Sequence, residues 1–323
     1  MLYPKPQRQL LYVISVAIMF LYGCSAEQKL AINYQKEFPE TPVLLRFNPE
    51  FYLTNSKIPI PEGLSEQENQ AYYDTAFSKS DLIQYIDGNR FLIQFEENFT
   101  NSLAANKFHI YEVDSITTFL TQRKPALIIE IEQLEIEEYI ILYNDYIDVD
   151  NQDYITTSLT GPIAKYEVEP VTIQVFYDGS KSYHAEINMN AISVNAWINV
   201  TIIKEGGTQS HELLYMQFEL SDEIEGDFVP YSLDYAEGAE YAFKRDSLNI
   251  KDLYSLQINS PQDFAQQITD YLINQVINDR LTMDNNRIKK REWYYSQKSG
   301  RILPVSEANS SIYNQNKIVE VGN

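Results

Sequence analysis

Four aspartates crowd one acidic segment between residues 144 and 169, at Asp145, Asp148, Asp150 and Asp153. Calcium takes roughly six to eight oxygen ligands, and closely spaced carboxylates in a loop can supply several of them. The segment lacks the glycine and the distal glutamate of an EF-hand, so a solvated acidic loop is the favoured interpretation. If this loop binds a metal, the sequence favours calcium. It indicates no other cofactor.

A second series of carboxylates alternates with apolar residues between Ala126 and Ile140. The acidic positions are Glu130, Glu132, Glu135, Glu137 and Glu138. Glycosidases set two carboxylates opposite each other across a cleft, whereas these lie along a single predicted strand. We therefore expect them to form the solvated face of a sheet, or a docking surface for a basic partner protein, rather than a catalytic pair.

No nucleophile elbow, Walker loop, dinucleotide fingerprint or His-Glu-x-x-His zinc motif occurs in the chain. The three histidines, His109, His184 and His211, stand singly at predicted strand starts or after a turn. A catalytic triad is recognised by geometry, so sequence order leaves a hydrolase open. Lone histidines at strand ends are more often surface or capping residues. We therefore expect a protein that is not an enzyme.

The segment from Arg287 to Arg301 reverses the sign of the charge, because six of its residues are basic. Arg291, Trp293, Tyr294 and Tyr295 lie at its centre. The favoured interpretation is a last hairpin that lies on the acidic body. The alternative is a contact with lipid headgroups or an acidic partner, since aromatic rings among cations suit an interface.

The only cysteine, Cys24, follows a short positive region and a 13-residue apolar run from Leu10 to Tyr22. A membrane-spanning helix needs about 20 apolar residues, so this run has the proportions of a signal-peptide core. The ending Leu21-Tyr22-Gly23-Cys24 resembles the lipobox of bacterial lipoproteins. That resemblance implies cleavage before Cys24 and acylation of its thiol. The alternative is an ordinary buried cysteine after a signal peptide.

The lipobox implies a signal peptide over residues 1–23 and a lipid-anchored tether over residues 24–42. By resemblance to lipoprotein sorting rules, Ser25 after the cysteine indicates the outer membrane. The next residues contain one acid and one base, which makes a surface-export signal weak. We expect a body on the periplasmic face rather than on the cell surface.

Composition narrows the classes of partner. The 323 residues are 44% hydrophobic and include 25 Tyr and 15 Phe, enough for a sizeable core. They carry 25 Lys and Arg against 46 Asp and Glu, a net charge of −21 that repels phosphate backbones and argues against nucleic acid. One cysteine and three histidines argue against a zinc site, a disulfide framework or an iron–sulfur cluster.

Two segments with periodic apolar residues predict a helix and a strand that would position the candidate site residues. Between Asn89 and Lys107, apolar residues recur every four positions and predict a helix, at Phe91, Phe95, Phe99 and Leu103. From Ala126 to Ile140, alternation of apolar and polar residues predicts a strand whose apolar set is Ile129, Ile131, Leu134 and Ile136. The alternation slips by one residue at Gln133, which predicts a bulge or a bend between two strands.

The remaining patterns complete an α+β domain over residues 43–282. A short strand over Val43–Phe47 and a meander over residues 171–220 predict a twisted antiparallel sheet, and a surface loop is expected over residues 56–70. Acidic loops are expected over residues 144–169 and after Leu220. Ser247 and Ser260-Pro261 each predict a helix start, and the helix from Gln262 to Leu281 is the second of two main amphipathic helices packed on one face. Residues 283–323 form the basic aromatic extension.

The order of these elements resembles the periplasmic accessory lipoproteins that are auxiliary components of ABC-type lipid-transport systems. The matching parts are residues 91–103, 108–113, 126–132, 193–220 and 263–277, and the strand Ala-Leu-Ile-Ile-Glu-Ile at residues 126–131 fits the shared pattern. The resemblance implies an accessory or scaffolding role and carries no catalytic residue. A glycan-binding lipoprotein, with Tyr72, Tyr73, Tyr294 and Tyr295 as the aromatic pairs, and a hydrolase remain the alternatives.

Overall fold

The structure is a computed structural model. It describes residues 41–58, 63–121, 126–148, 174–177, 181–203, 209–233, 236–285, 293–296, 301–304 and 319–320, with Asn33, Lys36 and Pro61 besides. Near the ends of several of these segments, and from residue 276 onward, only the backbone is described. Cys24, Asp150, Asp153 and Arg291 lie outside the described residues.

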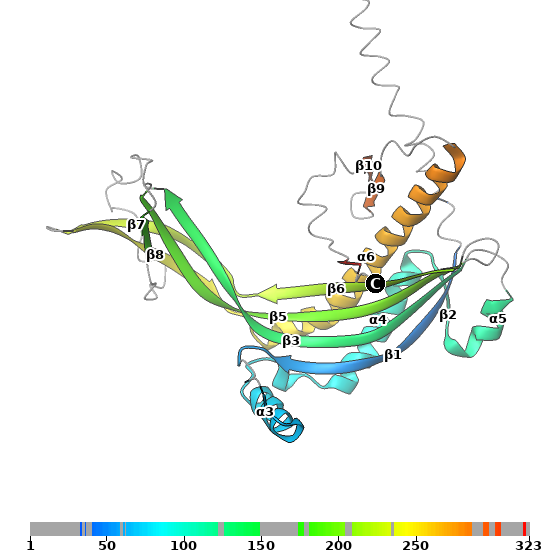
Figure 1. Ribbon diagram of the computed structural model, residues 1–323, viewed down its shortest axis with the longest axis horizontal. Coiled ribbons are helices and arrows are strands. Elements are labelled where there is room, and N and C mark those ends of the chain that lie inside the picture. Colours follow the sequence, from blue (N-terminus) through cyan, green and yellow to red (C-terminus); the bar gives the residue numbers. More distant parts are fainter. Residues whose placement is uncertain are drawn as a thin grey trace, which may run out of the picture.

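The largest element is a seven-stranded sheet in the order β11-β6-β5-β3-β1-β2, with β4 also paired to β5 (Figure 1). Its strands are β1 (Pro42–Asn55), β2 (His109–Tyr111), β3 (Ala126–Asp148), β4 (Gln174–Tyr177), β5 (Lys181–Ile203), β6 (Gln209–Ser221) and β11 (Val319–Glu320). The predicted α+β class is confirmed. The sheet is antiparallel from β3 to β6, as expected, but β1 runs parallel to both β2 and β3.

The parallel pairing follows from the long connection between β1 and β3, because parallel neighbours need a crossover. This connection contains α3 (Glu66–Ser78), the 3₁₀ turn η2 (Ile83–Tyr85), α4 (Gly88–Ala105), β2, the 3₁₀ turn η3 (Val113–Ser115) and α5 (Ile116–Leu120). Helix α3 replaces part of the loop predicted over residues 56–70. Its first turn is held by a capping box between Ser65 and Glu68.

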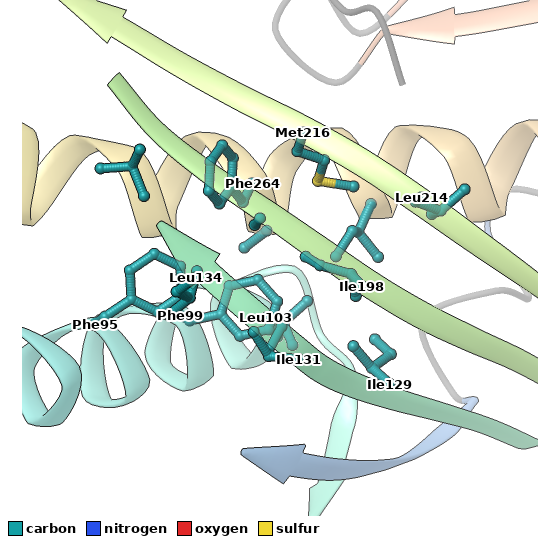
Figure 2. Close-up of a cluster of buried hydrophobic side chains, with 14 of the residues drawn as sticks. Phe95, Phe99, Leu103, Ile129, Ile131, Leu134, Ile198, Leu214, Met216 and Phe264 are labelled. Carbon is teal, nitrogen blue, oxygen red and sulfur yellow. The ribbon is translucent and has the colours of Figure 1, made fainter. Parts of the chain in front are cut away.

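The core lies between the sheet and two helices, α4 and α6 (Ile250–Asn285), which cover the same face, as predicted (Figure 2). The α4 positions Phe91, Phe95, Phe99 and Leu103 are all buried. The Phe95 ring lies 6.0 Å from Phe99 and 6.0 Å from Phe264 of α6. The apolar set of β3, at Ile129, Ile131, Leu134 and Ile136, packs beneath them.

The predicted phase slip is a β-bulge within one continuous strand. The pairing of β3 with β5 shifts between Ile131 and Gln133, and the pairing of β1 with β3 shifts between Phe47 and Glu50. The extra residue of β3 keeps Leu134 and Ile136 on the same face as Ile131. Burial of these residues confirms the apolar set that the sequence predicted.

Helix α6 is one continuous helix of 36 residues, so the prediction of separate helix starts at Ser247 and Ser260 was wrong. Pro261 lies inside it. Proline removes one backbone hydrogen bond, but the buried apolar stripe continues on both sides of it, from Leu256 to Phe264, and packing holds the helix together. The Ser260 hydroxyl donates to the Leu256 carbonyl at 2.7 Å.

The strands β3 and β5, each of 23 residues, extend well beyond the helices. Their far ends form an arm together with the hairpin of β7 (Glu223–Leu233) and β8 (Ala236–Asp246), at the left of Figure 1. This hairpin replaces the acidic loop expected after Leu220. Its acidic residues alternate with apolar ones, and Phe228, Tyr241 and Phe243 are buried against Ala185 and Ile187 of β5.

The basic aromatic extension contains a two-stranded antiparallel hairpin. Its strands are β9 (Trp293–Ser296) and β10 (Arg301–Pro304), and β9 lies against α6. The side chains of this hairpin are not among those that the structure describes.

Candidate partner-binding face

The sheet has one face that the two main helices do not cover. At one end of this face, α5 packs over Leu44, Ala126 and Ile128. At the other end, the β7–β8 hairpin packs over the arm. Between them, the described part of the chain places no helix or strand over the sheet. We define this central region, on β1, β3, β5 and β6, as the acidic face.

Four of the predicted glutamates, Glu130, Glu132, Glu135 and Glu137, come together on the acidic face. Arg46 of β1 pairs with Glu130 at 3.7 Å, and Thr54 Oγ1 donates to Glu135 at 2.7 Å. Asn199 Nδ2 donates to Glu132 at 3.2 Å, so the bulge residue also reaches this face. Glu132 is exposed, and Glu130, Glu135 and Glu137 are half-buried.

Aromatic side chains lie among these carboxylates. Trp197 of β5 and Tyr215 of β6 are cross-strand neighbours whose ring centroids are 5.1 Å apart. The Tyr215 hydroxyl donates to Asn195 Oδ1 at 3.0 Å, and Asn195 Nδ2 donates to Glu137 at 3.4 Å. The Tyr139 hydroxyl donates to Glu219 of β6. A hydrogen-bonded polar network thus orients the aromatic pair.

The electrostatic field of the acidic face is strongly negative. Burial and the charges of Glu137, Glu135 and Glu219 raise the pKa of the Tyr215 hydroxyl, because phenolate would be repelled there. Burial and Glu219 raise the pKa of Tyr139 in the same way. Within β1, β3, β6 and β5 from Ala185 onward, Arg46 is the only lysine or arginine. Such a face attracts cations and repels anions.

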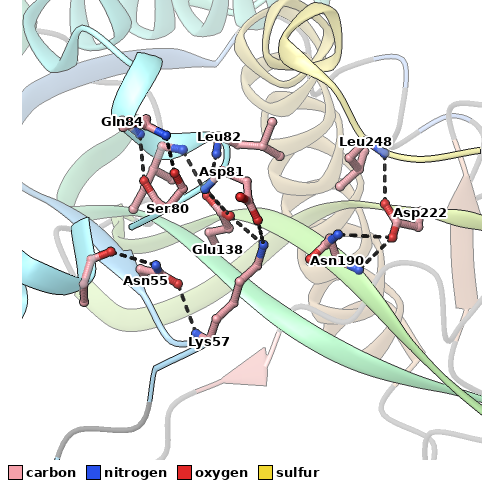
Figure 3. Close-up of polar contacts among 12 residues, drawn as sticks. Asn55, Lys57, Ser80, Asp81, Leu82, Gln84, Glu138, Asn190, Asp222 and Leu248 are labelled. Atoms are coloured by element: carbon pink, nitrogen blue, oxygen red, sulfur yellow. Dashed lines mark hydrogen bonds and ion pairs between the residues drawn. The ribbon is translucent and has the colours of Figure 1, made fainter. Parts of the chain in front are cut away.

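Glu138 corrects the prediction, because it is buried on the helix-covered side of β3 rather than exposed with the other glutamates (Figure 3). Its carboxylate accepts the backbone N–H groups of Asp81, Leu82 and Ile83 at 2.9–3.0 Å. The Lys57 ammonium lies 2.7 Å from it. The alternation after the bulge, Leu134, Ile136 and then Glu138, would have placed this residue on the core side. Glu138 therefore fastens η2 to the sheet.

Asp222 does the same at the point where the chain leaves β6, and no sequence pattern indicated it. Only 2% of it is exposed. It accepts the backbone N–H groups of Asn190 and Leu248, both at 2.9 Å (Figure 3). Because Leu248 lies two residues before the first residue of α6, Ile250, this contact fixes the start of the helix against β5. Both buried carboxylates are structural groups that the sheet and helix backbones satisfy.

The predicted calcium loop is only partly described. Asn144 to Asp148 belong to β3, which corrects the expectation that the loop begins at Asn144. Asp145 accepts a hydrogen bond from the Tyr241 hydroxyl at 2.9 Å. The side chains of Asp148, Asp150 and Asp153 lie outside the described set, so the calcium site stays a prediction. Among the described side chains, no group of three or more His, Cys, Asp or Glu residues is arranged so that it could hold a metal ion.

Of the residues named for the alternative functions, His109, His211, Tyr72 and Tyr73 have described side chains. His109 packs edge-on against Tyr111, with ring centroids 4.7 Å apart, and His211 Nδ1 lies 2.8 Å from the Thr201 hydroxyl. Tyr72 and Tyr73 are consecutive on α3, where neighbouring side chains do not share a face. The side chains of His184, Trp293, Tyr294 and Tyr295 are outside the described ones, as is Cys24 entirely.

Of the helices that the structure describes, none combines the length and the apolar character needed to span a membrane. No protein-family model and no curated protein matches the chain.

Proposed function

We propose that the protein is a non-enzymatic, lipid-anchored accessory or scaffolding lipoprotein of an outer-membrane or periplasmic assembly. It binds a basic partner protein through the acidic face. The observation that carries this proposal is the gathering of Glu130, Glu132, Glu135, Glu137 and Glu219 on one face of the sheet. Arg46 is the only described cation among them.

Charge complementarity defines the partner. A surface that presents several carboxylates and few cations steers positively charged partners toward it and disfavours acidic ones. Trp197 and Tyr215 add apolar area and ring faces, over which a lysine or arginine of the partner can pack. The partner is therefore a protein with a surface rich in lysine or arginine.

The anchor is proposed from the sequence alone. The apolar run that ends in Leu21-Tyr22-Gly23-Cys24 supports acylation of Cys24. Metabolic labelling with a palmitate analogue should mark the wild-type protein and leave the Cys24→Ala variant unmarked. An unlabelled wild-type protein that fractionates like the variant would remove the anchor from the proposal.

Partner binding is tested by neutralising the acidic face. The triple variant E130Q/E135Q/E137Q should reduce recovery of the crosslinked partner from envelopes by roughly tenfold or more, because about 1.4 kcal/mol of lost binding is one decade. The matched control is E96Q/E97Q/E112Q, which changes the charge equally but lies on the α4 side of the molecule. Equal recovery with both variants would contradict the proposal.

Glycan binding is the second candidate function, and the Trp197–Tyr215 pair favours it. Aromatic rings near the exposed Gln217 and the half-buried Asn199 offer a platform with amide hydrogen-bonding groups for a sugar ring. If this function holds, Trp197→Ala should abolish retention in a polysaccharide affinity assay, whereas the tyrosines at 72 and 73 should tolerate substitution. Retention unchanged by Trp197→Ala would exclude this face as a glycan site.

A further inference from the structure

The two edges of the main sheet differ in how they are protected. At one edge, β1 pairs with β2 only over Pro42–Leu44. The remainder of β1 contains Pro49 at a register shift, and Asn55 Nδ2 donates to the Ala76 carbonyl of α3 at 2.8 Å. Proline, bulges and covering helices are the usual devices that prevent an edge strand from pairing with another chain.

In the described part of the chain, the opposite edge strand, β6, has neither a proline nor a bulge, although α6 packs on its core face. Its 13 residues contain no proline, glycine or lysine, and they pair with β5 without a register shift. The structure describes only one strand beyond it, β11, whose Val319 and Glu320 pair with Tyr215 and Leu214. No described strand lies beside the stretch from Met216 to Ser221. The short β11 contact shows that an antiparallel strand fits at this edge.

The side chains of β6 define what such a strand would contain. Alternate side chains of an added strand would lie on the two faces of the sheet. On the helix-covered face, its neighbours would be Phe218 and Leu220, which are half-buried and pack on the edge of the core. On the other face, its neighbours would be the exposed Gln217 and Glu219, at the margin of the acidic face.

We infer that the outer edge of β6 binds an extended segment of the partner protein as an additional antiparallel strand. The segment alternates apolar residues with lysine or arginine. The inference rests on the proposed function, because it names how the basic partner is held. Main-chain hydrogen bonds to β6 give affinity, and the alternating pockets and carboxylates give specificity. The chain's own β11 occupies part of this edge and competes with the partner.

The test uses the mature chain and a labelled peptide of about eight residues in which valine and lysine alternate. A block peptide with the same composition, valines first and lysines after, has the same charge but cannot present the two kinds of side chain to opposite faces. By fluorescence anisotropy, the alternating peptide should bind roughly tenfold more tightly than the block peptide. N-methylation of its backbone along one edge should abolish that advantage.

Variants of the protein locate the site. Glu219→Lys should weaken binding of the alternating peptide roughly tenfold, whereas the matched control Glu97→Lys on α4 should not. Removal of residues 318–323 should strengthen binding, because β11 no longer competes for Tyr215 and Leu214.

The outcomes separate this inference from the proposed function. If both peptides bind equally, or if N-methylation has no effect, strand addition is wrong. If strand addition fails in this way but the variant E130Q/E135Q/E137Q no longer recovers the envelope partner, the proposed function stands and only the added strand is wrong. If the alternating peptide binds at β6 while the triple variant retains the envelope partner, the edge inference holds and the acidic face is not the partner site.

Discussion

The strands β3 and β5 run through two regions that bury opposite faces. In the body, α4 and α6 cover the face that carries Ile136 and Val194. In the arm, the β7–β8 hairpin covers the other face, which carries Ala185 and Ile187. Beyond Glu138 the series that began in the core continues as Ile140 and Leu142, whose exposed fractions are 47% and 52%. The elements that pack on a sheet, and not the strands alone, therefore determine which face is buried from solvent.

The two regions also differ in their interiors. The body has a continuous apolar cluster from two helices and four strands. The arm has a small cluster, and its central ring, Tyr241, keeps its hydroxyl bonded to Asp145 at 2.9 Å and close to Tyr143 at 3.3 Å. A small cluster with a polar centre opens more easily than a large apolar core. We therefore expect the arm to unfold locally before the body does.

The largest effect is expected in the body. Phe95→Ala removes a fully buried ring that contacts Phe99 and Phe264, and should cost about 3–5 kcal/mol of unfolding free energy in urea titrations. The control Ile93→Ala lies on the exposed side of the same helix, 59% exposed, and should stay within about 0.5 kcal/mol. A small loss for Phe95→Ala would mean that the body is not the more stable region.

A smaller effect is expected where body and arm meet. Glu138→Gln keeps the side-chain shape but removes the charge that Lys57 and three backbone N–H groups share. Because one buried donor loses its acceptor, we expect the free energy of unfolding in the same titration to fall by about 2–4 kcal/mol. The neighbouring Glu137→Gln, on the acidic face, should change stability by about 0.5 kcal/mol or less. Equal effects would contradict the structural role of Glu138.

In the arm, Gly226→Ala should destabilise locally. A Cβ at this position would lie 2.6 Å from Tyr241 Cε1 and 2.7 Å from Phe243 Cβ, so the Tyr241 ring would have to leave its place. We expect about 1–3 kcal/mol of local destabilisation, seen as faster amide exchange in β7 and β8 with the exchange of α4 unchanged. Glu225→Ala, exposed on the same strand, is the control. Faster exchange throughout the body would show that the two regions unfold together.

The smallest effect is a pH dependence confined to the arm. Burial and the hydrogen bonds with Tyr143 and Asp145 raise the pKa of Tyr241 above its usual value of about 10. The unfolded chain therefore loses this proton first, and the contribution to stability, complete below about pH 10, falls as the pH rises. The protection factors of the β8 amides, which exclude the base-catalysed rise of the intrinsic exchange rate, should fall above that pH in the wild type and depend less on pH in Tyr241→Phe. A faster exchange at acidic pH only would contradict this assignment.

Local periodicity predicted the parts of the fold that bury one regular stripe. Phe91 to Leu103 and Ile129 to Ile136 were placed correctly because a single face of each element is apolar. The β7–β8 hairpin was missed because its many acidic residues were interpreted as a loop, although they alternate with apolar residues over a short stretch. The parallel position of β1 was missed because pairing between distant segments leaves no local pattern. In the acidic face, the glutamates were predictable, but their neighbours Trp197 and Tyr215 meet only through the register of β5 and β6.

The extra residue at Glu132 sets the phase of everything that follows it in β3. If the strand ran past Glu132 without a bulge, Glu135 and Glu137 would point toward the phenylalanines of α4, and Leu134 and Ile136 would turn out to water. Deletion of Glu132 would instead leave a regular strand with the same two faces. Sequences that share this architecture should therefore either keep both the extra residue and the bulge between Ile131 and Leu134, or lack both together. A chain that kept the extra residue but formed no bulge would turn its carboxylates into the core and would have no acidic face.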